Sequence, residues 1–244
     1  MLNYIKIEAL RMLRNMRYVI FVVAFPVAFY LLFCSVYGNE TGPDGVRANI
    51  VIMVSMSAYG ALAASMMSTA VPWAQERQSG WLRQLQITPL SNLTIIMTKL
   101  VTSLLLVLPA ILFVCAAAVL FQGVSLPPGQ WAGLILTMWV GVIPFAALGL
   151  TIGSLLPPDT AQPVAMIGMF VLAILGGLWF PVETMPSAMK AIAHAMPSFN
   201  YADMGQSIVA GHGAPLSGVL TVGAWAVALG VIAVFAYRRA TVRA

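Results

Sequence analysis

Residues 75–91 read QERQSGWLRQLQITPLS and separate two long apolar stretches, Ile50–Ala74 and Ile96–Phe121. Only 8% of the residues in the chain are charged, yet Glu76, Arg77 and Arg83 fall within eight positions of this segment. A membrane protein keeps such a charged segment outside the hydrocarbon, where it meets water or a soluble partner. The sequence therefore predicts two membrane-spanning helices joined by a water-exposed polar segment.

The whole chain has the composition of an integral membrane protein. Hydrophobic residues make up 61% of it and the mean hydropathy is +0.93, whereas a soluble domain needs far more surface charge. About 20 helical residues cross a hydrocarbon core of about 30 Å, and continuous rather than alternating apolar runs argue against a β-barrel. We predict an all-α integral membrane protein with six transmembrane helices in a single domain, residues 1–244. The predicted spans are Tyr18–Tyr37, Ile50–Ala74, Ile96–Phe121, Trp131–Leu155, Pro163–Pro181 and Leu216–Tyr237.

The basic residues gather on one side of this predicted bundle. With an even number of spans, ten lie on the side of the two termini and of residues 75–91, and two lie on the other side. The larger group is Lys6, Arg11, Arg14, Arg17, Arg77, Arg83, Lys99, Arg238, Arg239 and Arg243, and the smaller is Arg47 and Lys190. Because basic residues favour the cytoplasmic side, we predict a multi-pass protein of a bacterial plasma (inner) membrane with both termini cytoplasmic. Anionic membrane lipid explains the net charge of +5 without a nucleic acid partner.

Two further segments do not fit a span. Residues 1–17 carry apolar residues at helical spacing and basic residues on another face, which predicts an amphipathic helix in the cytoplasmic interface, or simply a charged flank that sets topology. Residues 182–215 are half apolar and contain Pro197 between two runs too short to span. We predict two short re-entrant helices that close the outer mouth of the bundle; the alternative is a compact outer loop with no role in transport.

The sequence lacks the motifs of several chemistries. It has no G-x-x-x-x-G-K-[ST] loop, so we expect no ATP site on this chain. Its two histidines, His194 and His212, predict no catalytic group, and Cys34 and Cys115 both fall in apolar spans, which predicts neither a disulfide framework nor a metal site. Acidic residues are almost missing from the spans, although carriers driven by protons or sodium usually keep one there. The sequence therefore favours transport powered from outside the chain, with no catalytic residue and no bound cofactor.

Two stretches resemble the permease subunits of type-2 ABC exporters, which include drug and lipid exporters. The first follows E-R-x-x-G-x-L-x-x-L-x-x-T-P-L-S with a later lysine, and its matching residues are Glu76, Arg77, Gly80, Leu82, Leu85, Thr88, Pro89, Leu90, Ser91 and Lys99. Trp81 and Arg83 depart from the usual Thr and Glu. The second follows G-x-x-F-P-x-x-x-x-P and then a proline with an aromatic residue after it, matched by Gly177, Phe180, Pro181, Pro186, Pro197 and Tyr201. An arginine that often follows in the family is lacking.

The resemblance implies that residues 75–91 form a cytoplasmic coupling helix held by an ABC ATPase. Leu82 and Leu85, three residues apart, share one helix face and suit a groove of the partner. Gly80 permits a close approach, and Glu76 and Arg77 can pair across the interface. Closure of the ATPase would then move the attached spans as rigid bodies. The coupling residues are Glu76, Arg77, Gly80, Leu82, Leu85, Thr88 and Pro89, where Thr88-Pro89 ends the helix. The alternative is a charged cap that merely ends two spans.

The resemblance also implies partners and a transport pathway. ATP and Mg bind the ATPase subunits, a second permease copy completes a homodimer in membrane lipid, and the substrate is an amphipathic drug-like or lipid-linked molecule. The expected outer gate residues are Phe180, Pro181, Glu183, Pro186, Pro197 and Tyr201. Pathway candidates, chosen because Met-rich surfaces adapt to varied ligands, are Ser55, Ser65, Ser68, Met166, Met169 and Phe170. Ordinary helix packing explains these six residues equally well.

Two other functions remain open from the sequence. One is an integral-membrane enzyme acting on lipid or peptide, which needs clustered carboxylates or histidines at membrane depth. The other is a membrane assembly or immunity factor that keeps the ATPase-binding motif without transporting anything.

Overall fold

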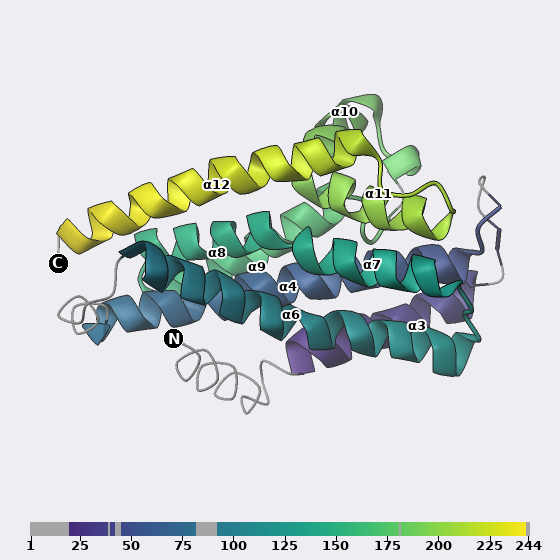
Figure 1. Cartoon of the computed structure of the whole chain (residues 1–244), viewed down its shortest axis with the longest axis horizontal. Helices are drawn as coiled ribbons and strands as arrows, with labels where there is room; N and C mark the ends of the chain where they lie inside the picture. The colour runs from purple at the N-terminus through teal and green to yellow at the C-terminus, as the bar shows by residue number, and fades with distance from the viewer. Residues whose placement is uncertain (1–19, 39, 42–44, 82–91, 181, 243–244) are drawn as a thin grey trace.

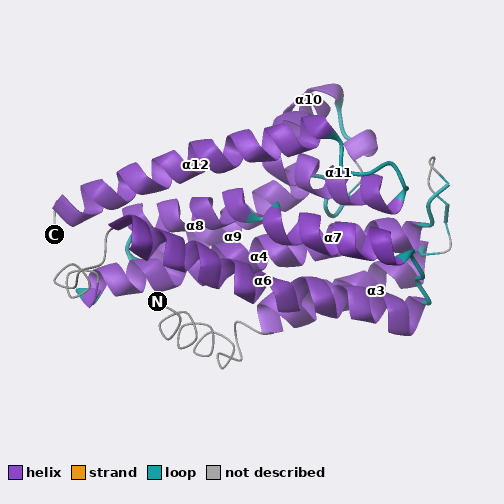
Figure 2. Ribbon diagram, in the orientation of Figure 1, coloured by secondary structure: helices purple, strands orange, loops and turns teal. Residues whose placement is uncertain are grey.

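The computed structural model describes residues 20–38, 40–41, 45–81, 92–180 and 182–242, which consist mainly of helices joined by short loops (Figures 1 and 2). A single β-bridge, between Thr41 and Arg47, is the extended pairing found in them. The elements are η1 (Ile20–Ala24), α3 (Phe25–Tyr37), α4 (Ala48–Gln78), α6 (Asn92–Gln122), α7 (Pro128–Val140), α8 (Ile143–Leu155), α9 (Pro158–Leu175), η2 (Val182–Thr184), α10 (Ser187–Ala195), α11 (Pro197–Val209) and α12 (Leu216–Val242). The amphipathic helix expected over residues 1–17 lies outside the described residues.

The all-helical class expected from the sequence is confirmed for the described residues. Within the part of the chain that the structure describes, five helical stretches are long and apolar enough to cross a membrane, and they are Ala48–Gln78, Thr94–Gln122, Pro128–Leu155, Pro158–Leu175 and Leu216–Tyr237. The first predicted span is described as the shorter apolar helix Val22–Tyr37. Six spans therefore remain a prediction.

Two of the predicted spans differ from the structure at prolines and glycines. The fourth is divided at Gly141 and Val142 into α7 and α8, because Pro144, in the first turn of α8, has no backbone N–H to donate to the carbonyl four residues earlier. The fifth, expected to start at Pro163, starts at Pro158, since proline suits the first helical turn. It ends at Leu175, and not at residue 181 as predicted, because Gly177 with φ 69° turns the chain away.

Helix α4 forms the centre of the bundle. In its most apolar window 78% of the residues are buried, against 22% in α9 and in α12. Small residues let neighbouring helices approach it closely. A Cβ at Gly149 of α8 would lie 2.1 Å from Oγ1 of Thr69, and one at Gly153 would lie 2.3 Å from the carbonyl oxygen of Ala70. Glycine is therefore required at both places for α8 to pack on α4.

The two ends of the bundle differ in character. Figure 1 shows the end of α4, the start of α6 and the end of α12 together at one end of the molecule. The short helices α10 and α11 lie at the opposite end, next to the outer parts of α7 and α12. This arrangement brings the polar residues that end α4 to the same end as Arg238 and Arg239 of α12.

Candidate coupling site

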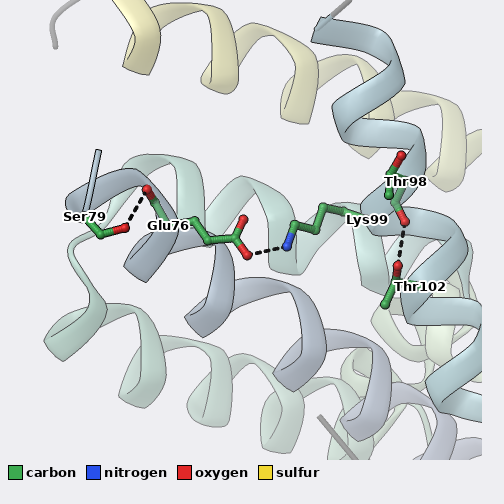
Figure 3. A network of polar contacts seen from close by, with 5 residues as sticks. All are labelled: Glu76, Ser79, Thr98, Lys99 and Thr102. Atoms are coloured by element: carbon green, nitrogen blue, oxygen red, sulfur yellow. Dashed lines mark hydrogen bonds and ion pairs between the residues drawn. The ribbon is translucent and has the colours of Figure 1, made fainter. Parts of the chain in front are cut away.

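The last turns of α4 carry a buried ion pair to α6. Nζ of Lys99 donates to Oε1 of Glu76 at 2.5 Å, and both residues are almost completely buried (Figure 3). Opposite charges at this separation attract strongly in a medium of low dielectric constant. The two residues are 23 positions apart, and it is the antiparallel packing of α4 and α6 that brings them together.

The hydroxyl groups around this pair bind their own helices. Thr98 Oγ1 donates to the carbonyl of Thr94 at 2.8 Å, and Thr102 Oγ1 donates to the carbonyl of Thr98 at 2.9 Å (Figure 3). Ser79 Oγ donates to the carbonyl of Glu76 at 3.2 Å. Each of these three hydroxyl groups therefore has a hydrogen-bond acceptor three or four residues earlier in the chain.

Arg77, the next residue of α4, binds the end of α8. Its Nη1 donates to the carbonyl of Ser154 at 2.8 Å and its Nη2 to the carbonyl of Leu156 at 2.7 Å. The last carbonyls of a helix have no partner within it and carry a partial negative charge, so a guanidinium fork suits them well. Trp73 adds a bond from Nε1 to Oγ of Ser154 at 2.8 Å.

These contacts join three helix ends. Glu76 fixes the end of α4 to α6, whereas Trp73 and Arg77 fix it to α8. All of them lie within the last two turns of α4, directly before the segment expected to contact a soluble partner. We call this group the polar clamp; it consists of Trp73, Glu76, Arg77, Lys99, Ser154 and the carbonyl of Leu156.

Comparison with known proteins identifies the family of the chain. A family model described as "ABC-2 family transporter protein" matches residues 44–237. The chain belongs to the ABC-2 transporter family. It is also similar to a protein of Bacillus subtilis (strain 168) named "Putative transport permease YvfS", with 28% identity over 204 residues, 84% of this chain and 83% of that protein. The resemblance inferred from the two motifs is confirmed. The chain is thus a multi-pass membrane subunit of an ABC transporter.

The structure changes the interpretation of two coupling residues of this permease. The sequence suggested that Glu76 and Arg77 pair across an interface with another protein, but in the structure both side chains bind within the chain. The motif did not reveal this, because the acceptors of Arg77 are backbone carbonyls and the partner of Glu76 lies on another helix. Gly80 has φ 75° and open space beside it, in keeping with a helix that ends at Gln78. Leu82, Leu85, Thr88 and Pro89 lie outside the described residues.

The serines expected along a pathway are mostly engaged in packing. Ser65 Oγ donates to the carbonyl of Leu62, and Ser68 Oγ donates to Ser103 of α6 at 3.2 Å. Both serines are buried between helices of this chain, and their place on a substrate pathway stays a prediction. Ser55 is also buried and lies 3.4 Å from Nε2 of Gln206 on α11.

The candidates on α9 lie beside a group of aromatic rings. Met169 is buried, while Met166 and Phe170 are partly exposed. The ring of Phe170 lies 5.5 Å from that of Trp179, which in turn contacts Tyr59 of α4 at 5.3 Å and Phe29 of α3 at 6.1 Å. Trp179 was not identified from the sequence, although it stands directly before Phe180 in the second motif.

The outer segment of the permease contains two short helices. They are α10 and α11, with the break at Met196 and Pro197 in the first turn of α11. Asn200 Nδ2 donates to the carbonyls of His194 and Met196, which fixes the corner between the helices. Tyr201 is fully buried and its hydroxyl donates to a backbone carbonyl of α7 at 2.5 Å.

Two of the remaining residues expected at the outer gate are exposed. Phe180 and Pro186 are exposed, and Pro186 precedes the first residue of α10. Pro181 and the side chain of Glu183 lie outside the described residues.

Proposed function

We propose that this permease is the membrane-spanning subunit of an ATP-driven ABC exporter and that residues 75–91 form its coupling helix. The observation that carries the proposal is the polar clamp, which cross-links three helix ends directly before residues 82–91, where the family motif continues. A cytoplasmic ABC ATPase subunit holds this segment and supplies the ATP and Mg sites. Because the end of α4 is tied to α6 and α8, a displacement of the segment moves several spans together.

Docking is tested by adding a charge to the predicted contact face. Leu85→Asp places a carboxylate on the Leu82/Leu85 face and should abolish co-purification of the ATPase while the permease still inserts. Gln84→Asp adds the same charge off that face and should leave the complex intact. Unchanged assembly and hydrolysis in the Leu85 variant would show that the lever model is wrong. Stimulation of ATP hydrolysis by added lipids or drugs then separates an exporter from a non-transporting assembly factor.

The second permease copy is proposed to cover α9. This helix has the lowest mean hydropathy of the five candidate spans, 1.4, and only 22% of its window is buried, whereas α6 has a hydropathy of 3.0. A helix exposed to lipid on this scale is expected to be strongly apolar. Contact with a second copy explains an exposed but less apolar helix. Co-purification of an untagged copy with a tagged one tests the homodimer, and cysteine pairs along α9 test the face.

The substrate is proposed to be an amphipathic drug-like or lipid-linked molecule that passes beside α9. The partly exposed rings of Phe29, Phe170 and Trp179 offer an aromatic surface at this place. Phe170→Ala should weaken stimulation of hydrolysis by an aromatic substrate found in a screen, while Phe113→Ala, an exposed aromatic residue of α6, should not. Equal effects of the two variants would place the pathway elsewhere.

The outer helices are proposed to dip into the outer leaflet and close the pathway. In α10, Ala193 is buried, while Ala191, Ile192 and His194 are exposed. Single cysteines over residues 189–196, in a chain whose two native cysteines are replaced by alanine, should therefore label with a membrane-impermeant thiol reagent in a helical pattern. Trapping the ATPase in its closed state should change the pattern, whereas uniform labelling would mean that the segment is only a loop.

The topology is proposed to place both termini in the cytoplasm of a bacterial inner membrane. Reporter fusions after Ser91 and at Ala244 should both report the cytoplasm. A report from the outer side at Ala244 would contradict the count of six spans.

A further inference from the structure

We propose that Arg77 is a positioning residue that carries movement of the coupling segment into α9 by way of the turn between α8 and α9. The inference rests on the proposed function, because it assumes that residues 75–91 are moved by an ATPase. It assigns a separate task to one side chain of the polar clamp.

The guanidinium group of Arg77 binds the turn between α8 and α9 at Leu156, the first residue of that turn. Its two nitrogens bind the carbonyls of Ser154 and Leu156 at 2.8 and 2.7 Å, one within the last turn of α8 and one just beyond it. Only Pro157 separates Leu156 from α9, whose first turn is closed by the bond from the amide of Ala161 to the carbonyl of Pro157 at 2.8 Å. A guanidinium that fixes Leu156 therefore fixes the start of α9 as well.

The close glycine packing between α4 and α8 stops before this turn. Gly153 is the last glycine of α8, and a Cβ there would touch the α4 backbone, whereas Leu155, two residues later, is 58% exposed. Beyond Gly153, hydrogen bonds from Trp73 and Arg77 tie α4 to Ser154 and Leu156. Arg77 alone among them reaches past the end of the helix to Leu156.

Glu76, the residue before Arg77, ties the same turn of α4 to another helix, α6. Glu76 binds Lys99 of α6, whereas Arg77 binds a different neighbour, α8. The last turn of α4 is therefore held on two sides, so a tilt that begins after Gln78 cannot be absorbed by one helix alone. The bond of Arg77 then passes the tilt to the α8–α9 turn, and α9 carries the partly exposed Met166 and Phe170.

The experiment compares two fluorescent reporters in the permease purified in lipid with its ATPase. One reporter is attached to Gln75→Cys at the end of α4 and the other to Thr160→Cys in the first turn of α9, both at exposed positions, in a chain free of native cysteines. Each is measured before and after the ATPase is trapped with ATP and vanadate. The test variants are Arg77→Lys and Arg77→Ala. Gln78→Ala, an exposed change beside Arg77, is the control.

With native Arg77, we expect both reporters to respond to trapping. Arg77→Lys keeps the charge but cannot bind both carbonyls as a planar fork. Loss of one charge-assisted hydrogen bond shifts the balance between joined and separated helix ends by about tenfold. The response at residue 160 should therefore fall strongly in Arg77→Lys and vanish in Arg77→Ala, while the response at residue 75 persists.

The outcomes separate this inference from the proposed function. If residue 160 still responds fully in both variants, Arg77 does not transmit movement and the inference fails. If both reporters fall silent while the ATPase stays bound, Arg77 acts on the coupling segment itself, and the inference also fails. If no ATPase binds the permease with native Arg77, or trapping moves neither reporter there, the proposed function fails first. If Arg77 only stabilises the fold, its variants should unfold at a lower temperature while the ratio of the responses at residues 160 and 75 stays unchanged, and the inference fails.

Discussion

Replacing Lys99 by methionine should destabilise the permease severely, because it removes the ammonium that lies 2.5 Å from the buried carboxylate of Glu76. Removing one partner of a buried ion pair costs about 3–5 kcal/mol, since the other buried charge loses the attraction of that partner. Glu76→Met should cost a similar amount for the same reason. The double variant Glu76→Met/Lys99→Met has two apolar side chains of similar volume in place of the pair, and such replacements change stability by about 1 kcal/mol or even raise it.

The cycle is measured as thermal unfolding of the purified permease in lipid nanodiscs. At about 2–4 °C per kcal/mol for a chain of this size, each single variant should unfold about 6–20 °C lower, and the double variant should unfold close to the unaltered chain. Thr102→Val is the control on the same face of α6, because its hydroxyl bonds only its own helix and its loss should cost about 1 kcal/mol. If the double variant loses the sum of the two single losses, the residues act independently and the ion-pair argument is refuted.

Three further predictions concern the packing and the outer helices. Gly153→Ala should lower the unfolding temperature because its methyl group would lie 2.3 Å from a backbone carbonyl of α4, while Gly223→Ala, with nothing within 4 Å, should raise it slightly in the same assay. Tyr201→Phe should cost about 1–3 kcal/mol, measured by the same unfolding, because it leaves a buried carbonyl of α7 without its 2.5 Å donor. Burial raises the pKa of the Asp203 carboxyl group, and the nearby His194 lowers it by a smaller amount. Between pH 3.8 and the raised pKa the folded chain binds one more proton than the unfolded chain, so its stability should fall as the pH rises through this range. Asp203→Asn should flatten this dependence when unfolding is measured across acidic pH.

The general plan of this molecule could be predicted from hydropathy and one motif. The end of α4 lies within a few residues of its predicted position because the charge at Glu76 and Arg77 stops the apolar run. The position of Lys99 was also noted, as part of the motif. Its pairing with Glu76 was not, because it depends on how α4 and α6 align, and the sequence does not fix that alignment. No side-chain pattern predicts the acceptors of Arg77, since they are backbone carbonyls, one in the last turn of α8 and one just beyond it.

Hydropathy also fails to tell which helix is buried by its own chain. The windows of α4 and α9 have similar mean hydropathy, 1.8 and 1.4, yet 78% of the first and 22% of the second are buried. In α4 the moderate value reflects small residues such as Gly60, Ala64 and Ser68, which permit close packing all round the helix. In α9 it reflects polar residues of the first two turns, including Asp159 and Gln162, which remain exposed. Contact with lipid favours neither the small residues of α4 nor the polar residues of α9. We therefore expect a partner surface on α9, the less apolar helix that its own chain leaves uncovered. In this permease α9 begins at the turn held by the polar clamp.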